Sequence, residues 1–106
     1  MPKFLVIADY TPEGAKGVQS KGGGARRDAV KQMAEGLGGS LESFHFAFGA
    51  HDAYVVVDLP DNESAAAVAI AVNATGGAKV ETVVLLTPEE VDAAAQKSVG
   101  YRAPGS

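Results

Sequence analysis

The chain has 106 residues, a length that suits one domain and is too short for two. Its formal net charge of −4 argues against general nucleic-acid binding, and the absence of cysteine excludes disulfides and thiolate chemistry. No apolar run approaches the roughly 20 residues of a membrane helix, and the first residues do not resemble a signal peptide. We therefore expect a soluble cytoplasmic protein, with one domain over residues 1–98 and a flexible tail over residues 99–106.

The first part of the chain predicts one strand followed by two helical segments. Residues 3–10 are apolar and β-prone on both faces, as in a strand that is covered on two sides. Thr11 and Pro12 indicate a helix start, with threonine as the N-cap and proline in the first turn. Glycines 22–24 break or bend that helix, and a stronger one follows and ends at Gly38. The apolar stripe of the second helix consists of Val30, Met33, Ala34 and Leu37.

The middle of the chain predicts a β-hairpin. Residues 41–48 alternate in polarity and residues 52–59 are rich in β-branched side chains, so each range is expected to form a strand. Residues 49–51 form the tight connection between them. On the first of these strands, Leu41 and His45 are expected on one face. The other face then carries the phenylalanines Phe44, Phe46 and Phe48.

The last part predicts a helix, a strand and a final helix. Pro60 and Asp61 open an alanine-rich helix that reaches about residue 74, and residues 78–86 follow as a fourth strand. Residues 87–90 read Thr-Pro-Glu-Glu, a capping box with proline in the first helical turn. This motif begins a last helix that extends to about residue 97.

The order β-α-β-β-α-β-α is that of the ferredoxin-like, or split βαβ, arrangement with an extra C-terminal helix. In this α+β fold, two helices cover one face of an antiparallel sheet. The expected strands are apolar on both faces, so the second face also needs a cover, and another copy of the chain is the favoured one. We therefore expect a homo-oligomer that is at least a dimer.

Several segments resemble the GYD-domain family. They are residues 41–52 with the valines that follow, and the segments 10–14, 26–39 and 86–90. In their order and spacing the resemblance covers about residues 1–97. The family's Gly-x-Tyr-Asp signature maps onto Gly49, His51 and Asp52, so a histidine stands where the family has tyrosine. The resemblance implies a dimeric α+β barrel, in which two ferredoxin-like sheets pack face to face. That group includes small isomerases, cofactor-free monooxygenases and haem-binding proteins.

His51 and Asp52 are the first candidates for chemistry. A carboxylate beside an imidazole can orient it and raise its pKa, which gives a general acid or base near neutral pH. The favoured alternative is structural: Asp52 caps the hairpin turn, His51 is solvated, and Gly49 supplies a positive φ angle. Adjacent strand residues point to opposite faces, which further weakens a direct pair.

Other candidates lie on or at the ends of strands. His45 is either a hydrogen-bonded core histidine or a ligand in a pocket, and the core interpretation is favoured. Asp9 ends the first strand and Asp58 the third, which is expected to run parallel beside it, so the two carboxylates could share a proton. Capping of turns is the favoured role for both. A metal site from His45, His51, Asp9 and Asp52 would depend wholly on tertiary contact.

The run Gly22-Gly23-Gly24 before Arg26 and Arg27 resembles an anion cradle, but a hinge before a charged helix is the favoured reading. The favoured function is an oligomeric ligand-binding or interaction module. Its candidate contact residues are Tyr10, His45, Gly49, His51 and Asp52. The alternative is a small acid–base enzyme with a pocket between sheet and helices. A weaker alternative is metal or haem binding through the histidines.

Overall fold

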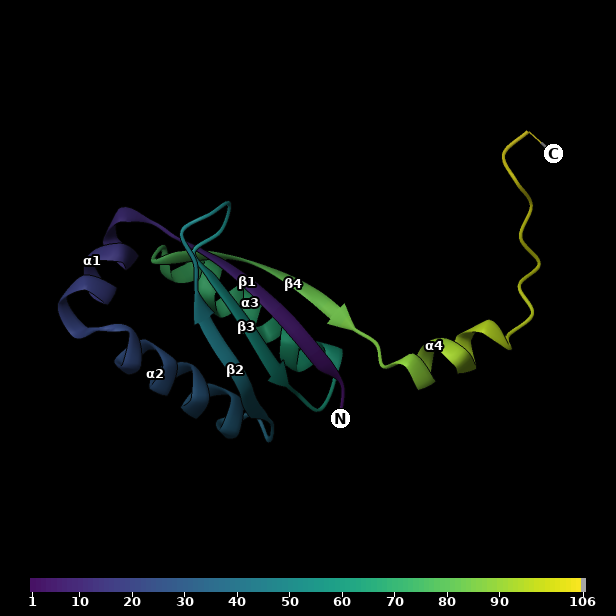
Figure 1. Ribbon diagram of the computed structural model, residues 1–106, viewed down its shortest axis with the longest axis horizontal. Coiled ribbons are helices and arrows are strands. Elements are labelled where there is room, and N and C mark those ends of the chain that lie inside the picture. The colour runs from purple at the N-terminus through teal and green to yellow at the C-terminus, as the bar shows by residue number, and fades with distance from the viewer. Residues whose placement is uncertain (106) are drawn as a thin grey trace.

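A computed structural model describes residues 1–105, which form one antiparallel sheet and four helices (Figure 1). The strands pair in the order β2-β3-β1-β4, and each neighbouring pair is antiparallel. This confirms the ferredoxin-like fold that the element order predicts. The elements are β1 (Lys3–Tyr10), α1 (Pro12–Lys21), α2 (Gly23–Gly36), β2 (Ser40–Phe46), β3 (Ala53–Asp58), α3 (Asn62–Thr75), β4 (Ala78–Leu85) and α4 (Pro88–Ala95).

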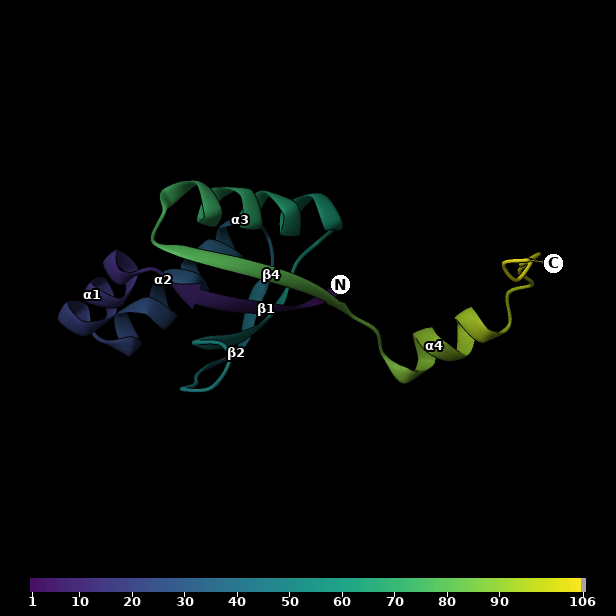
Figure 2. The same ribbon diagram turned by 90° about the horizontal axis from the view of Figure 1, so that it is seen from above.

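Helices α2 and α3 pack against one face of the sheet, and the core lies between them and the strands. Every second residue of β3 is buried there, as the period of a strand requires. Val30 and Ala34 of α2 belong to this cluster, which confirms the predicted apolar stripe of that helix, and Val68 of α3 belongs to it as well. Figure 2 shows α3 lying along this face of the sheet. Phe4 and Leu59 are the largest side chains that are completely enclosed.

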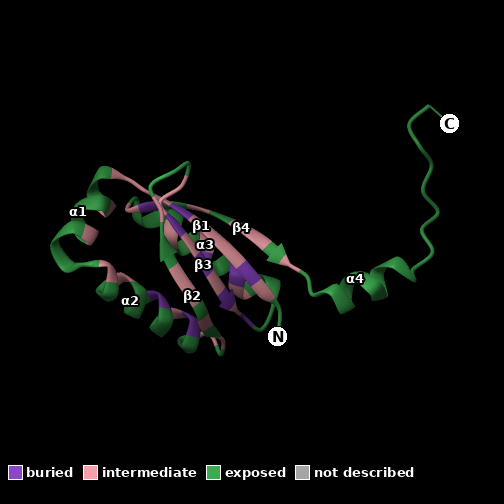
Figure 3. Ribbon diagram, in the orientation of Figure 1, coloured by how far each residue is buried: buried purple, intermediate pink, exposed green. Residues whose placement is uncertain are grey.

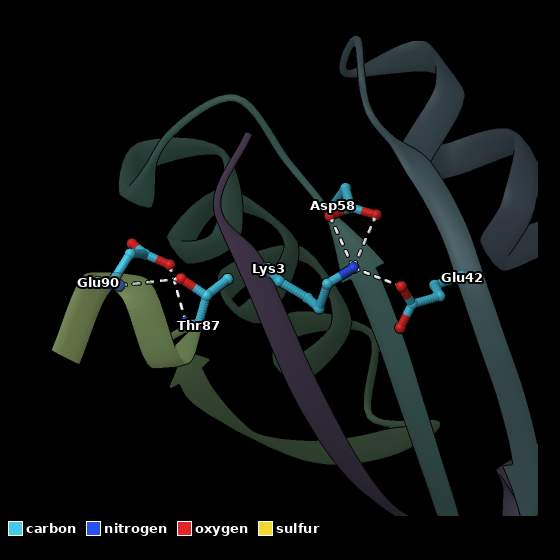
Figure 4. A network of polar contacts seen from close by, with 5 residues as sticks. All are labelled: Lys3, Glu42, Asp58, Thr87 and Glu90. Atoms are coloured by element: carbon cyan, nitrogen blue, oxygen red, sulfur yellow. Dashed lines mark hydrogen bonds and ion pairs between the residues drawn. The ribbon is translucent and has the colours of Figure 1, made fainter. Parts of the chain in front are cut away.

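Local capping signals determine where the helices begin. The Thr11 hydroxyl accepts a hydrogen bond from the Gly14 N–H at the start of α1, and the Asp61 carboxylate accepts one from Ser64 at the start of α3. Thr87 and Glu90 form the reciprocal capping box of α4 (Figure 4). Gly22 separates α1 from α2. Its φ of 88° is not helical and is a conformation that glycine adopts far more readily than other residues.

The structure corrects the predicted strand β2 in two respects. The pairing with β3 shifts between Leu41 and Ser43, which is a β-bulge. The bulge reverses the alternation upstream, so that Leu41 packs on the helix-covered face with Phe44 rather than beside His45. The strand ends at Phe46, so Phe48 lies in the following loop, where it is fully exposed instead of continuing the aromatic face.

The relation between β1 and β3 is also corrected. The sequence interpretation placed the two strands parallel, but they are antiparallel neighbours, with Lys3 opposite Asp58. In the split βαβ arrangement β3 returns between the two strands joined by the first crossover, so it runs against β1. Asp9 and Asp58 therefore lie at opposite ends of the sheet.

The C-terminal helix α4 does not pack on the domain. It points away from the sheet (Figure 1), and none of its residues is buried (Figure 3). The radius of gyration is 16.7 Å, whereas a compact chain of this length would measure about 13 Å. Within residues 1–105, no helix combines the length and the apolarity that crossing a bilayer requires.

Candidate functional site

The hairpin loop between β2 and β3 is fastened to the end of β1 by Asp52. Its backbone N–H donates to the Ala8 carbonyl at 3.0 Å, and its Oδ2 accepts from the Tyr10 N–H at 2.8 Å. The Asp52 carbonyl also accepts from Ala47 at 2.8 Å, which closes the loop. Asp52 thus bonds backbone groups, as the structural interpretation holds, but it joins the loop to β1 rather than capping the turn. Gly49 is not among the glycines with positive φ, so that part of the interpretation is wrong.

His51 contacts Asp9 rather than its sequence neighbour Asp52. The His51 Nδ1 lies 3.0 Å from Asp9 Oδ2 and 3.2 Å from Asp9 Oδ1. The imidazole also meets the Tyr54 ring edge-on, with 6.1 Å between ring centroids. Both members of the pair are partly exposed. A carboxylate that bonds Nδ1 fixes the imidazole's orientation. The carboxylate that orients His51 is therefore that of Asp9 and not that of Asp52.

The remaining predicted side chains are distributed over the sheet. His45 is exposed on β2, where it pairs with Tyr54 on the face that carries no helix. It is therefore not a core histidine, which corrects the favoured reading. Asp58 lies too far from Asp9 to share a proton, because the two occupy opposite ends of antiparallel strands. No cluster of three or more His, Cys, Asp or Glu side chains that could hold a metal occurs among residues 1–105.

Asp58 instead takes part in an ion-pair cluster at the start of β1. The Lys3 ammonium donates to Glu42 of the bulge and to Asp58 Oδ1 at 3.0 Å (Figure 4). The hydrogen bond to Glu42 and then that to Asp58 raise the pKa of Lys3 above its ordinary 10.5. Both carboxylates thereby link β2 and β3 to β1.

A cleft of about 610 Å³ opens among α1, α2 and the C-terminal part of α3. We call it the interhelical cleft. Its walls are mainly small or apolar, with Ala25, Ala29 and Met33 from α2 facing Ala71 and Val72 from α3. The polar side chains that line it are Tyr10, Lys21, Arg26 and Thr75.

The close attachment of α1 to the α3–β4 connection shapes one end of this cleft. The Thr11 N–H donates to the Gly77 carbonyl at 3.1 Å, and the Thr11 hydroxyl donates to the Gly76 carbonyl at 2.7 Å. At Gly14, an added Cβ would lie 1.8 Å from the Gly77 oxygen, so only glycine permits this approach. The helix is therefore held by its first turn, while its later residues form the wall of the cleft.

A smaller cavity of about 40 Å³ lies beneath the cleft, between the helices and the sheet. It is lined by core residues such as Val30, Val55 and Val80. The cavity and the cleft adjoin, since they share five lining residues. These are Tyr10, Arg26, Met33, Val72 and Ala78. The cleft and the cavity together form a mainly apolar recess that also contains a few polar side chains.

Arg26 is the exceptional side chain of this region. It lies on α2 where the cleft and the cavity adjoin, and its Nε is buried without a hydrogen-bond partner among the described residues. The next residue, Arg27, is exposed and pairs with Asp28 at 3.2 Å. Among residues 1–105, no side-chain carboxylate lines the interhelical cleft, although the chain as a whole carries a net charge of −4. The recess is thus a local cationic region in an acidic protein.

The sequence indicated this region only in part. Tyr10, one of the five predicted contact residues, lines both the cleft and the cavity, whereas His45, Gly49, His51 and Asp52 line neither. In the sequence, Arg26 follows a glycine run that favours a hinge over an anion-binding site. The available signal was the pair of adjacent arginines on a helix with only one neighbouring aspartate, which leaves one of them without a local partner.

Comparison with known proteins gives a family. The family model described as the GYD domain matches residues 4–95, from β1 to the end of α4. No curated protein and no solved structure matches the chain. The matched range leaves out only the chain's first residues and the segment after α4, so it contains the sheet, the hairpin and the cleft. On this match, the chain belongs to the GYD domain family.

Proposed function

We propose that this GYD domain is a small-molecule-binding module that works as a homo-oligomer. The observation that carries the proposal is the interhelical cleft and the cavity beneath it. Pockets for small molecules typically measure about 300–1,000 Å³ and combine apolar walls with a few polar groups. The cleft, at about 610 Å³, lies in this range, and Tyr10, Lys21 and Arg26 supply the polar groups.

Binding is preferred to acid–base catalysis because of where the titratable groups lie. An enzyme of the predicted kind needs at least one of its candidate residues in a pocket between sheet and helices. Neither the cleft nor the cavity is lined by any of the five. These candidates are Asp9, His45, His51, Asp52 and Asp58. The His51–Asp9 couple lies at the end of the sheet and is partly exposed. A cytoplasmic location stays a prediction from the sequence.

The binding proposal is tested with a chemically diverse fragment library and ¹H–¹⁵N NMR of the labelled protein. We expect bound fragments to shift the amide signals of α1, of the first half of α2 and of the end of α3. Ala71→Trp should abolish these shifts, because the indole fills the cleft from its α3 side. Ala66→Trp is the matched control, since Ala66 is also exposed on α3 but does not line the cleft. A library with no cleft binder, or binding that is indifferent to Ala71→Trp, would contradict the proposal.

Self-association is proposed through the sheet face opposite the helices, which we call the open sheet face. Its apolar residues come from β1, β3 and β4 and are half-buried. They are Leu5, Ile7, Tyr54, Val56, Val83 and Leu85. An apolar surface of this kind is typical of a protein interface. The observation that favours a second copy is the charge on the rim. Each end of the open sheet face carries both a positive and a negative side chain, so two copies can place opposite charges against each other. These residues are Lys3, Glu42 and Asp58 at one end and Lys79 and Asp9 at the other.

Light scattering during size-exclusion chromatography tests the proposed self-association through the open sheet face. We expect at least the mass of a dimer for the wild-type chain and a monomer for Val56→Glu, which puts a charge at the centre of the open sheet face. Ile70→Glu is the control, because Ile70 is exposed on α3 and far from that face. Circular dichroism shows that each variant is folded. A wild-type protein that runs only as a monomer refutes the oligomer.

A further inference from the structure

Arg26 is half-buried as a residue, but its Nε is a buried nitrogen that finds no hydrogen-bond partner within residues 1–105. Buried polar groups are nearly always hydrogen-bonded, and a buried donor left without a partner costs stability. A guanidinium has five N–H donors and no acceptor, so only an acceptor can satisfy it. Within residues 1–105 no acceptor reaches Nε, and the Arg26 side chain lines both the interhelical cleft and the cavity beneath it.

The charge around the recess has one sign. Lys21 and Arg26 are the only charged side chains that line the cleft within residues 1–105. The next residue on α2, Arg27, is already paired with Asp28. A field of one sign in a recess with apolar walls concentrates ligands of the opposite charge. The positive charge of the cleft therefore favours an anionic ligand.

We infer that the ligand of this cleft is a small amphipathic oxyanion. Its carboxylate or phosphate head pairs with the Arg26 guanidinium, and its short apolar tail runs along Met33 and Val72 toward the inner cavity. The inference rests on the proposed binding function and gives it a ligand class. Two parallel N–H···O bonds from guanidinium to an oxyanion are among the strongest polar contacts in proteins. Lys21, on the outer part of the cleft, attracts the head group as a point charge.

Hexanoate, hexyl phosphate and the neutral hexanamide form a matched set of probes. They share a linear apolar tail of similar length and differ in the head group. We expect the two oxyanions to shift the amide signals around the cleft, with dissociation constants about tenfold below that of hexanamide. The two oxyanions distinguish a carboxylate ligand from a phosphate ligand, and tighter binding of either one supports the inference.

Two arginine variants locate the effect. Arg26→Gln should weaken hexanoate binding about tenfold and hexanamide binding much less, because it removes the charge and keeps a polar chain. Arg26→Lys should bind hexanoate with an affinity between those of the wild type and Arg26→Gln, since an ammonium keeps the charge but cannot make the two parallel hydrogen bonds. Arg27→Gln is the control, because Arg27 neighbours Arg26 on α2 but points its charge at Asp28. The NMR spectrum of each unliganded variant reports whether it is folded.

The outcomes separate this inference from the proposed function. If hexanamide binds in the cleft as tightly as hexanoate, or if Arg26→Gln leaves hexanoate binding intact, the anion inference is wrong while the binding function stands. If neither these probes nor the fragment library shifts the amides around the cleft, both are wrong. Discrimination of about tenfold that disappears in Arg26→Gln supports both.

Discussion

The two faces of the sheet differ in how their apolar side chains are covered and in how the polar groups near them are paired. The covered face buries its side chains under α2 and α3 but leaves the Arg26 Nε without a partner. The open sheet face has no helical cover, yet its charges at the start of β1 are satisfied within the chain, where Lys3 bonds Glu42 and Asp58. The contrast indicates that the covered face keeps a place for a small polar ligand, whereas the open face presents an apolar surface to a macromolecule.

The largest expected difference between the faces is in core packing. Phe4 is 1% exposed on the covered face, and Phe4→Ala should lower the free energy of unfolding by about 4 kcal/mol through the cavity it leaves. Leu5, the next residue, lies half-buried on the open sheet face, so Leu5→Ala should cost about 1 kcal/mol in the monomer. Urea denaturation at low protein concentration measures both. Equal losses for the two variants would show that the open face is packed like a core.

A smaller effect of opposite sign is expected at Arg26. Arg26→Met keeps a long side chain and removes the buried Nε donor that has no partner, so it should raise the free energy of unfolding by about 1 kcal/mol in the absence of ligand. Thermal unfolding followed by circular dichroism measures the shift. Arg27→Met, which removes an exposed and paired arginine, is the control and should change little. A destabilised Arg26→Met protein would mean that the guanidinium already has a partner that stabilises the fold.

The smallest effect is the pH dependence of the Lys3 cluster. Because hydrogen bonds to Glu42 and Asp58 raise the pKa of Lys3, its contribution to stability is present below 10.5 and is lost as the pH rises through the raised value. The difference in melting temperature between wild type and Lys3→Met should therefore stay constant from neutral pH to about 10 and shrink at higher pH. Lys31→Met serves as the control, since Lys31 is exposed on α2 and makes no ion pair within residues 1–105. A difference in melting temperature that grows with pH would contradict a stabilising role for the ion pairs of protonated Lys3.

Helix starts, strand positions and the order of elements were predictable because they depend on neighbours in the chain. Thr11, Asp61 and Thr87 each accept a hydrogen bond from a backbone N–H three residues later, so a short window of sequence contains the whole signal. The apolar stripe of α2 is likewise read from spacing alone. The family resemblance adds to this and is confirmed by the GYD domain match over residues 4–95.

The candidate site was harder to predict because its parts come from distant segments. His51 is adjacent to Asp52 in sequence, yet it bonds Asp9, since the hairpin loop closes over the end of β1. The bulge between Leu41 and Ser43 shows no signature in the sequence, and it decides which side chains of β2 face the core. Sequence alternation alone assigned Leu41 to the wrong face for that reason.

For this protein, the sequence by itself determined the set of elements, their order and the fold that follows from them, since capping and periodicity act within a few residues. Only the tertiary structure decided the antiparallel relation of β1 and β3, the partner of His51 and the surroundings of Arg26. Each of these depends on how strands pair and how helices pack across long stretches of chain, and a side chain left without a partner can be recognised only when all its neighbours are in place.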